Sequence, residues 1–214
     1  MYETGADTVF NYTCAPYFGD CGDFVSHDGY DYSTVLIGEQ CWFAENCRYL
    51  PEVSPSSEGN ETDPYYYVYG YEGTDVASAM STSNYATYGV LYNWPAVMTE
   101  GICPSGWHIP SDGEFTELTD FLGGESVAGV AMKSTYGWYS GGNGSNSSGF
   151  TGLPGGRLDD NGSIDDLLML GCFWSSSPQG GTDSWYRTLA YFFSHVEVDV
   201  RNQSFGMSAR CIKD

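Results

Sequence analysis

The sequence predicts an α+β fold built from short, mostly antiparallel strands, one or two helices and long ordered loops. Of its 214 residues, 41% are hydrophobic and 16% are aromatic, which is enough to bury a sizeable core. Its 28 glycines and 18 tyrosines favour short strands and ordered loops over a helical bundle. A single stretch near the middle of the chain carries strong helix signals, and the C-terminal segment carries several strand signals.

The N-terminal part predicts one hairpin. Residues 1–20 are a polar lead-in segment, and residues 21–214 are expected to form a single domain. Residues 30–37 (YDYSTVLI) and 41–47 (CWFAENC) have the composition of strands, and the intervening GEQ has that of a short turn.

Residues 51–87 change character and predict an insertion loop. PEVSPSSEGNETDP is rich in turn residues, and the aromatic run YYYVYGYEG follows it. The run is compatible with sugar binding, but packing into the core is the favoured interpretation. Residues 88–98 (YGVLYNWPAVM) are apolar and fit a strand or a helix equally well.

The strongest helix signal begins at Ser111. Ser111 and Glu114 have the spacing of a capping box, in which each side chain satisfies a backbone N–H at the helix start. Apolar residues then recur at helical spacing and Gly123-Gly124 ends the pattern: Phe115, Leu118, Phe121 and Leu122. The preceding GICPSGWHIP is therefore expected to be a rigid approach to the helix, with His108 in a structural role. A second helix is expected over 125–133.

The C-terminal segment predicts strands separated by turn residues. The expected strands are CFWSSS, SWYRTLAYFF, HVEVDV and FGMSARCI. In SHVEVDVR, the valines alternate with polar residues, so the valines should face the core and the polar set the opposite face. The polar set is His195, Glu197, Asp199 and Arg201. An ordinary two-faced sheet explains this pattern, and a ligand-binding face is the alternative.

The charge balance excludes several classes of partner. The chain has 28 acidic and 7 basic residues, a net charge of −21. Such a surface repels nucleic acid and anionic membranes, and leaves cationic partners, calcium or plain solvation. No apolar run is long enough to cross a bilayer, so no membrane insertion is expected. The N-terminus lacks a signal-peptide core, so we expect a signal already removed, or one domain of a longer secreted protein.

Seven cysteines are scattered without a CxxC pair, which indicates disulfides in an oxidising compartment. Cys21 and Cys41 flank the first hairpin and are expected to pair. Two of Cys14, Cys47 and Cys172 can form a further bridge, and the sequence leaves the choice open.

Several motifs together resemble a known family. They are AENCRYL, YGVLYNW, GICPSGWHIPSDGEFTELTDFLGG, KSTYGW, NSSGFTGLPGGR, FWSSSP, SWYRTLAY and FGMSARCIKD. Their order resembles that of the Fibrobacter succinogenes major paralogous domain, from about Cys21 to the C-terminus. The resemblance implies a C-type-lectin-like fold in the branch related to formylglycine-generating enzymes, and a secreted or bacterial cell-surface location.

The resemblance also carries expectations about function and disulfides. It implies a bridge between Cys103 and Cys211, which would join the helix region to the last strand. Cys47 and Cys172 stand where the family usually has other residues, which implies an extra disulfide or a free thiol. The leading expectation is a non-catalytic binding or adhesion domain for a glycan or a protein surface. Alternatives are an oxidase-like enzyme, a structural module, and a ligand-binding protein diversified by a retroelement.

The sequence offers little for catalysis and one candidate metal site. The three histidines and the absence of GxSxG give little support for nucleophilic catalysis. Calcium is the one cofactor that the sequence suggests, because hard oxygen ligands crowd a glycine-containing loop. The candidate ligands are Asp159, Asp160, Asn161, Ser163, Asp165 and Asp166.

The candidate ligand surface lies on the C-terminal strands. If those strands are regular, Phe192 and Phe193 cannot both point inward, so one of them should be exposed or capped by a loop. Exposed aromatic, acidic and histidine side chains would form an amphipathic patch suited to sugar rings or protein side chains. The expected outward set is Tyr186, Thr188, Phe192, Phe193, His195, Glu197 and Asp199.

Overall fold

Antiparallel pairing of the N-terminal strands begins the fold. The computed structural model describes residues 21–214; the predicted lead-in 1–20 and Cys14 lie outside this range. One five-stranded sheet has the spatial order β1 (Phe24–His27), β2 (Tyr30–Ile37), β3 (Gln40–Phe43), β12 (Ile212–Lys213), β6 (Trp107–His108). The predicted hairpin is confirmed, because Ile37 pairs with Gln40 across the turn. The second strand is shorter than predicted and ends at Phe43.

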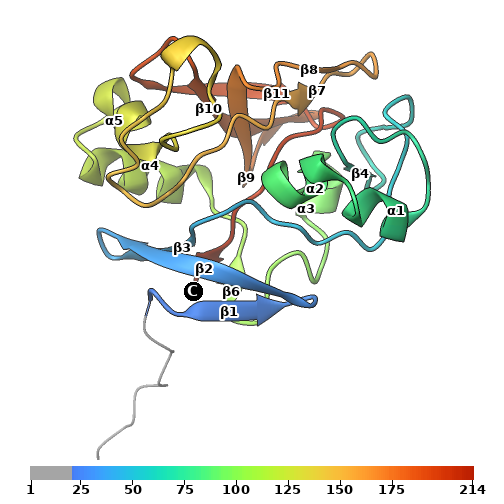
Figure 1. Cartoon of the computed structure of the whole chain (residues 1–214), viewed down its shortest axis with the longest axis horizontal. Coiled ribbons are helices and arrows are strands. Elements are labelled where there is room, and N and C mark those ends of the chain that lie inside the picture. The colour runs from blue at the N-terminus through green and yellow to red at the C-terminus, as the bar shows by residue number, and fades with distance from the viewer. Residues whose placement is uncertain (1–20) are drawn as a thin grey trace, which may run out of the picture.

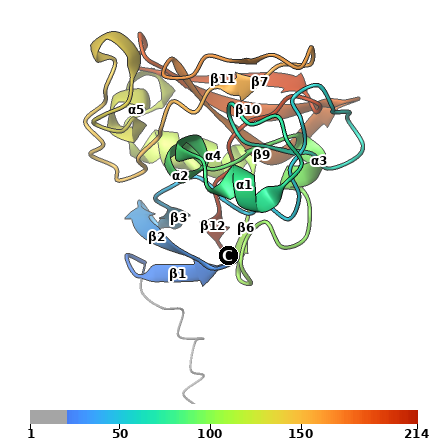
Figure 2. The same ribbon diagram turned by 45° about the vertical axis from the view of Figure 1, so that its right-hand side comes forward.

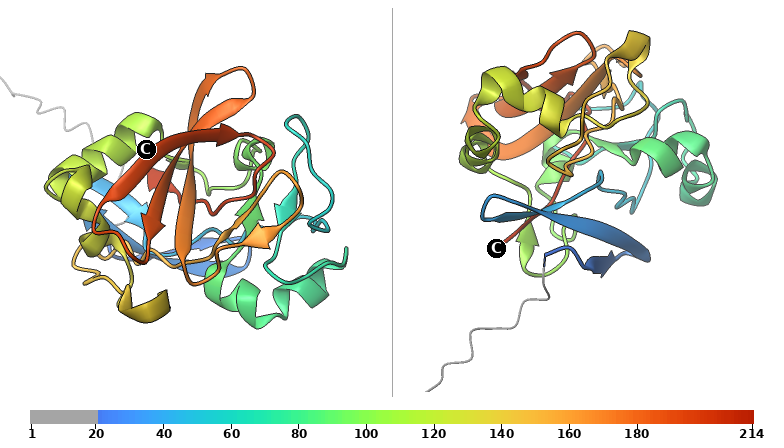
Figure 3. Two further views of the ribbon diagram at one scale, coloured as in Figure 1. Left: turned by 90° about the horizontal axis from the view of Figure 1, so that it is seen from above. Right: turned by 60° about the vertical axis from the view of Figure 1, so that its left-hand side comes forward.

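The C-terminal strands form a separate sheet at the opposite end of the molecule (Figure 1). Its order is β11 (Val196–Asn202), β10 (Asp183–Ala190), β9 (Leu170–Gly180), and all its pairings are antiparallel. Seen from above, these strands lie in front of the rest of the protein (Figure 3). The fold is therefore mixed α+β with mostly antiparallel strands, as predicted.

The last segment of the chain joins the two sheets. Residues 205–211, predicted as a strand, instead make isolated bridges before β12. The backbone of Ser208 exchanges hydrogen bonds with Cys172 and Trp174 of β9, and the carbonyl of Cys211 accepts one from Phe43 of β3. Figure 2 shows this segment descending from the upper sheet to β12 near the C-terminus.

Two helices cover one side of the upper sheet. Helix α4 (Asp112–Phe121) has the predicted capping box, with the Ser111 side chain accepting from Glu114 N–H and the Glu114 carboxylate from Ser111 N–H. Helix α5 (Glu125–Met132) matches the second predicted helix and packs against β11 and α4. Phe115, Leu118 and Met132 are buried in a cluster with Trp42, Phe150 and Leu189.

The segment 51–87 is more structured than the predicted loop. It contains α1 (Val76–Met80), most of α2 (Ser83–Tyr88) and β4 (Tyr66–Tyr67), which pairs with β5 (Leu91–Tyr92). The aromatic run packs into the core as favoured, because Tyr66, Tyr67 and Val68 are at most 3% exposed. The ambiguous residues 88–98 hold both a strand, β5, and a helix, α3 (Trp94–Val97). The remaining elements are the η1 turn (Tyr139–Gly141), β7 (Arg157–Leu158) and β8 (Ile164–Asp165).

Both predicted disulfides are confirmed. Cys21 bonds to Cys41, and Cys103 bonds to Cys211 across a sequence separation of 108 residues. In the chain-entropy model, a loop of this length stabilises the fold by about 4–5 kcal/mol. Cys47 and Cys172 are free and buried, so among the described cysteines no third bridge forms.

Candidate functional site

A groove lies along the exposed face of β10 and β11, where the sequence placed the ligand surface. It encloses about 410 Å³ and is called the sheet groove below. This volume is within the range of small-ligand sites. Its lining residues are Arg157, Leu170, Tyr186, Thr188, His195, Glu197, Val198, Asp199 and Arg201.

The register of the two strands brings the predicted residues together. Tyr186 is paired with Asp199, and Thr188 with Glu197. Residues directly opposite each other in an antiparallel pair project from the same face. Glu197 and Asp199 are exposed at the rim, and His195 is half-buried at one end.

Tyr186 and Thr188 lie on the predicted face of the sheet but are not exposed on it. Each is only 4% exposed, so they form the floor of the groove. The Tyr186 ring packs edge-on against Trp174, and the Thr188 hydroxyl lies 3.7 Å from the Cys172 sulfur. The reason is that β9 supplies large side chains to the same face, and period-2 patterning within β10 alone could not reveal them.

Phe192 and Phe193 belong to a turn, not to the predicted strand. Strand β10 ends at Ala190, and residues 191–195 connect it to β11. Phe192 is 59% exposed, so one of the two rings is exposed, but its position in a turn and not strand alternation accounts for this. Phe193 is half-buried, and its ring lies 4.1 Å from the His195 ring, which joins this turn to the groove.

Two arginines outside the predicted ligand set border the groove, although strand alternation already places Arg201 on the polar face. Arg157 of β7 and Arg201 of β11 also line a second hollow of about 350 Å³, so these two side chains lie between the two depressions. The Nε atom of Arg157 lies 3.0 Å from Asp159 and 3.4 Å from Asp166. Its Nη atoms make no hydrogen bond within residues 21–214, and neither is a buried unsatisfied atom, so both are open to solvent.

Most other cations are engaged inside the fold. Arg210 and Arg187 are at most 1% exposed, and Lys133 is 3% exposed. Arg210 alone donates to Asn46 and to the carbonyls of Phe43, Phe150 and Thr151. The signal that could have pointed to Arg157 was the scarcity of basic residues, seven in the chain. The sequence alone does not show which basic side chains stay exposed to solvent, because that depends on tertiary packing.

The acidic loop predicted to bind calcium folds back on Arg157. Asp159 and Asp166 flank its guanidinium, and Asp165 accepts a 2.7 Å hydrogen bond from Ser163. Burial would lower the pKa of Arg157, but nearby negative groups, including Asp159 and Asp166, raise it. Within residues 21–214, no three His, Cys, Asp or Glu side chains are grouped to hold a metal ion. Calcium binding remains a prediction for Asp159, Asp160, Asn161, Ser163, Asp165 and Asp166.

A separate cavity of about 440 Å³ lies beside Cys103, lined by residues 97–109 and Ser176. It contains His108, whose Nδ1 lies 2.6 Å from Asp214 and whose Nε2 lies 2.9 Å from Glu114. With both ring nitrogens engaged, His108 has the structural environment predicted for it. This cavity therefore offers fewer free polar groups than the sheet groove.

The comparisons with known proteins give one result. No curated protein and no solved structure matches the chain significantly. No helix in the described part of the chain is long and apolar enough to cross a membrane. The family model of the Fibrobacter succinogenes major domain matches residues 35–213. That range covers most of the chain and every residue that lines the sheet groove, and the protein belongs to this family.

Proposed function

We propose that the protein is a non-catalytic binding domain, secreted or cell-surface, that holds a glycan in the sheet groove. The proposed fold is a branch of the C-type-lectin-like fold. Disulfide bonds that persist in oxidising compartments are in keeping with such a location.

The observation that carries this proposal is the mixture of donors and acceptors along one concave face. Glu197 and Asp199 offer carboxylate acceptors, and Arg157 and Arg201 offer guanidinium donors. Thr188 and Tyr186 lie between them on the floor. A sugar presents hydroxyl groups that both donate and accept, so alternating charged side chains can bind it without a matching charge.

The concave shape favours a glycan over a protein partner. Protein interfaces are broad and need about 800 Å² of surface on each side. The sheet groove instead has the dimensions of a small-ligand site, with a ring-bearing turn at one end.

Immobilised glycans, with immobilised proteins beside them, test the proposal. The wild type should bind at least one glycan, and Glu197→Ala should weaken that binding about tenfold by removing charged hydrogen bonds. Glu117→Ala is the matched control, because Glu117 is an exposed carboxylate on α4, outside the groove. Binding to proteins alone, or equal binding by both variants, would contradict the proposal.

A further inference from the structure

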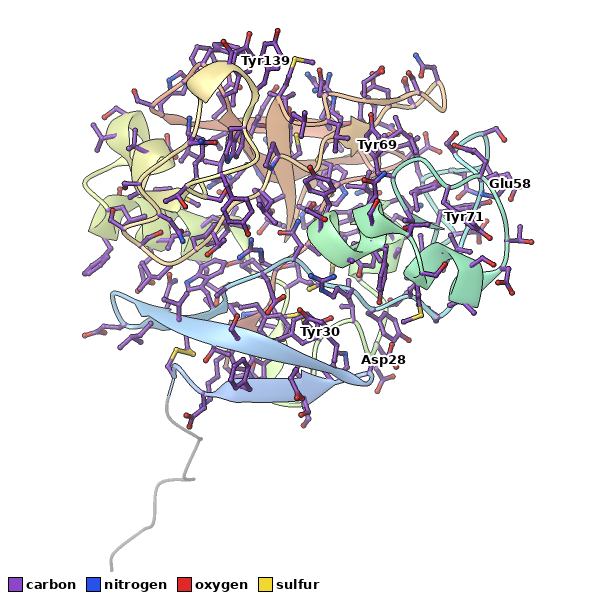
Figure 4. The ribbon with its side chains drawn as sticks, in the orientation of Figure 1. Asp28, Tyr30, Glu58, Tyr69, Tyr71 and Tyr139 are labelled. Atoms are coloured by element: carbon purple, nitrogen blue, oxygen red, sulfur yellow. A yellow bond between two sulfur atoms is a disulfide. The ribbon has the colours of Figure 1, made fainter. Side chains whose placement is uncertain are left out.

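A row of aromatic rings continues the sheet groove beyond His195. It consists of Tyr139, Tyr191, Phe192 and Phe193 and is called the aromatic ridge below. Successive ring centroids are separated by 5.4 Å, 4.9 Å and 4.1 Å, and Phe193 lies 4.1 Å from the His195 ring of the groove. Figure 4 shows Tyr139 at the outer edge of the molecule, on the side of β10 and β11.

The aromatic ridge exposes large apolar side chains to solvent. Phe192 is 59% exposed and Tyr139 is 54% exposed. Leu168 and Met169, 38% and 36% exposed, lie on the segment whose carbonyls accept from the backbone N–H of Tyr139 and Tyr191. A contiguous exposed patch of this kind on a soluble domain commonly marks a binding surface.

The turn that carries the ridge is held rigidly from below. The buried ammonium of Lys133 donates hydrogen bonds of 3.0 Å and 2.7 Å to the carbonyls of Ala190 and Phe193. Gly129 lies one helical turn before Lys133 and packs directly against the same turn. A Cβ atom added at Gly129 would lie only 2.5 Å from the carbonyl oxygen of His195. A Cβ at Gly142 would lie 2.2 Å from that of Tyr191. Such close packing fixes the backbone of the turn before a ligand arrives, which lowers the entropic cost of ordering the turn on binding.

Charge decides which ligand fits the ridge and the groove together. The ridge itself carries no ionic group, and at the groove Arg157 and Arg201 are balanced by Glu197 and Asp199. A polyanion would be repelled by a chain of net charge −21. The C–H faces of neutral sugar rings stack on aromatic side chains, and their hydroxyls suit the mixed donors and acceptors of the groove.

We infer that the site takes a neutral, linear polysaccharide, with one stretch in the sheet groove and the following sugars stacked on the aromatic ridge. This inference rests on the proposed glycan-binding function and adds the ligand's charge and length. A ligand of one or two sugars contacts only the sheet groove. Each further sugar that reaches the aromatic ridge adds contact with its rings.

Affinity gel electrophoresis tests the charge of the ligand. The full chain is run through gels containing mixed-linkage β-glucan, glucomannan, pullulan or polygalacturonate. At least one neutral polymer should retard the protein, and polygalacturonate should not. Retardation by polygalacturonate alone, or by none of the four polymers, would overturn the inference.

Chain length and paired variants test the ridge. Oligosaccharides of two to six sugars, cut from the retarding polymer, are titrated calorimetrically; wild-type affinity should rise with length. Phe192→Ala should keep the disaccharide affinity and lose about tenfold for the hexasaccharide. Phe24→Ala is the control: Phe24 is 74% exposed on β1, at the other end of the molecule.

The same titrations separate the two proposals. If Glu197→Ala weakens the binding of every oligosaccharide and Phe192→Ala has no effect, the ridge inference fails and the groove function stands. If Phe192→Ala weakens hexasaccharide binding and Glu197→Ala has no effect, the groove function fails and stacking on the ridge stands. Equal affinity for two and six sugars would overturn the ridge inference directly.

Discussion

The ammonium group of Lys133 donates a 2.7 Å hydrogen bond to the carbonyl oxygen of Phe193. Lys133 is the C-cap residue of α5, so the helix end is tied directly to the turn that displays the aromatic ridge. Burial lowers the pKa of Lys133, because the low-dielectric surroundings disfavour the charged amine. The two carbonyls that it contacts compensate for part of this cost.

Lys133→Met should loosen the turn. The variant keeps the aliphatic stem but leaves the carbonyls of Ala190 and Phe193 without the donor they have now. We expect the free energy of unfolding to fall by about 1–3 kcal/mol, measured by urea denaturation. Hexasaccharide affinity should fall at the same time, because the ridge is no longer fixed. If the free energy of unfolding of Lys133→Met equals that of the wild type, Lys133 does not hold the turn.

Gly129→Ala should be costly although alanine favours helices. The new methyl would lie 2.5 Å from the His195 carbonyl oxygen and 2.7 Å from that of Ser194. Displacing α5 from β11 should cost about 1–3 kcal/mol in urea denaturation.

Gly113→Ala in α4 is the matched control. Its added Cβ meets only the Ser111 hydroxyl, at 3.8 Å. It should therefore keep or gain stability, by up to about 1 kcal/mol. Equal effects of the two substitutions would mean that close packing at Gly129 is unimportant.

His108 should make stability depend on pH. Burial alone would lower the pKa of this imidazole, but hydrogen bonds to Asp214 and Glu114 outweigh burial and raise it. The unfolded pKa is about 6.5. Because the folded pKa is higher, the stabilisation is fully present below about pH 6.5 and is lost as pH rises through the folded pKa.

His108→Gln removes the titrating group. The stability difference between wild type and His108→Gln, measured by urea denaturation from pH 6 to pH 9, should therefore shrink as pH rises. Since the His108 side chain is 41% exposed, solvent screening keeps the effect small. A difference that is constant, or that grows with pH, would contradict the role given to the Asp214 and Glu114 contacts.

Cys47 should replace Cys103 when that residue is removed. The sulfur of Cys47 lies 3.5 Å from the Cys211 sulfur. Burial raises the pKa of the Cys47 thiol to about 12, which keeps it unreactive while the Cys103–Cys211 bridge is intact. In the Cys103→Ser variant, Cys211 loses its partner and becomes a free thiol beside Cys47. A non-reducing peptide map after oxidative refolding should show a Cys47–Cys211 disulfide, and finding both thiols free would refute the expectation.

Local signals were sufficient for much of the framework. The capping box at Ser111 and the strand at residues 30–37 depend on neighbouring residues, and both occur as predicted. The two helices within residues 75–88 were missed, although Asp75 and Thr82 cap them with their side chains. The turn-rich composition of the whole segment concealed these two short helices.

The candidate site was only partly predictable. Alternation in β11 correctly placed Glu197 and Asp199 on one face, because strand periodicity is local. Arg157 comes from a distant hairpin, and Tyr139 from a turn far from β10 in sequence, so no local pattern links them to the groove. The burial of Tyr186 likewise depends on Trp174 of β9.

Backbone amide chemical-shift mapping, with the hexasaccharide from the retarding polymer, tests the central claim most directly. The account predicts that the largest shifts fall on Thr188, Glu197, Asp199 and the turn 191–195, which together line the groove and carry most of the ridge. It also predicts small shifts for residues 97–109, which line the separate cavity beside Cys103. Shifts concentrated in residues 97–109, with β10 and β11 unchanged, would contradict the account.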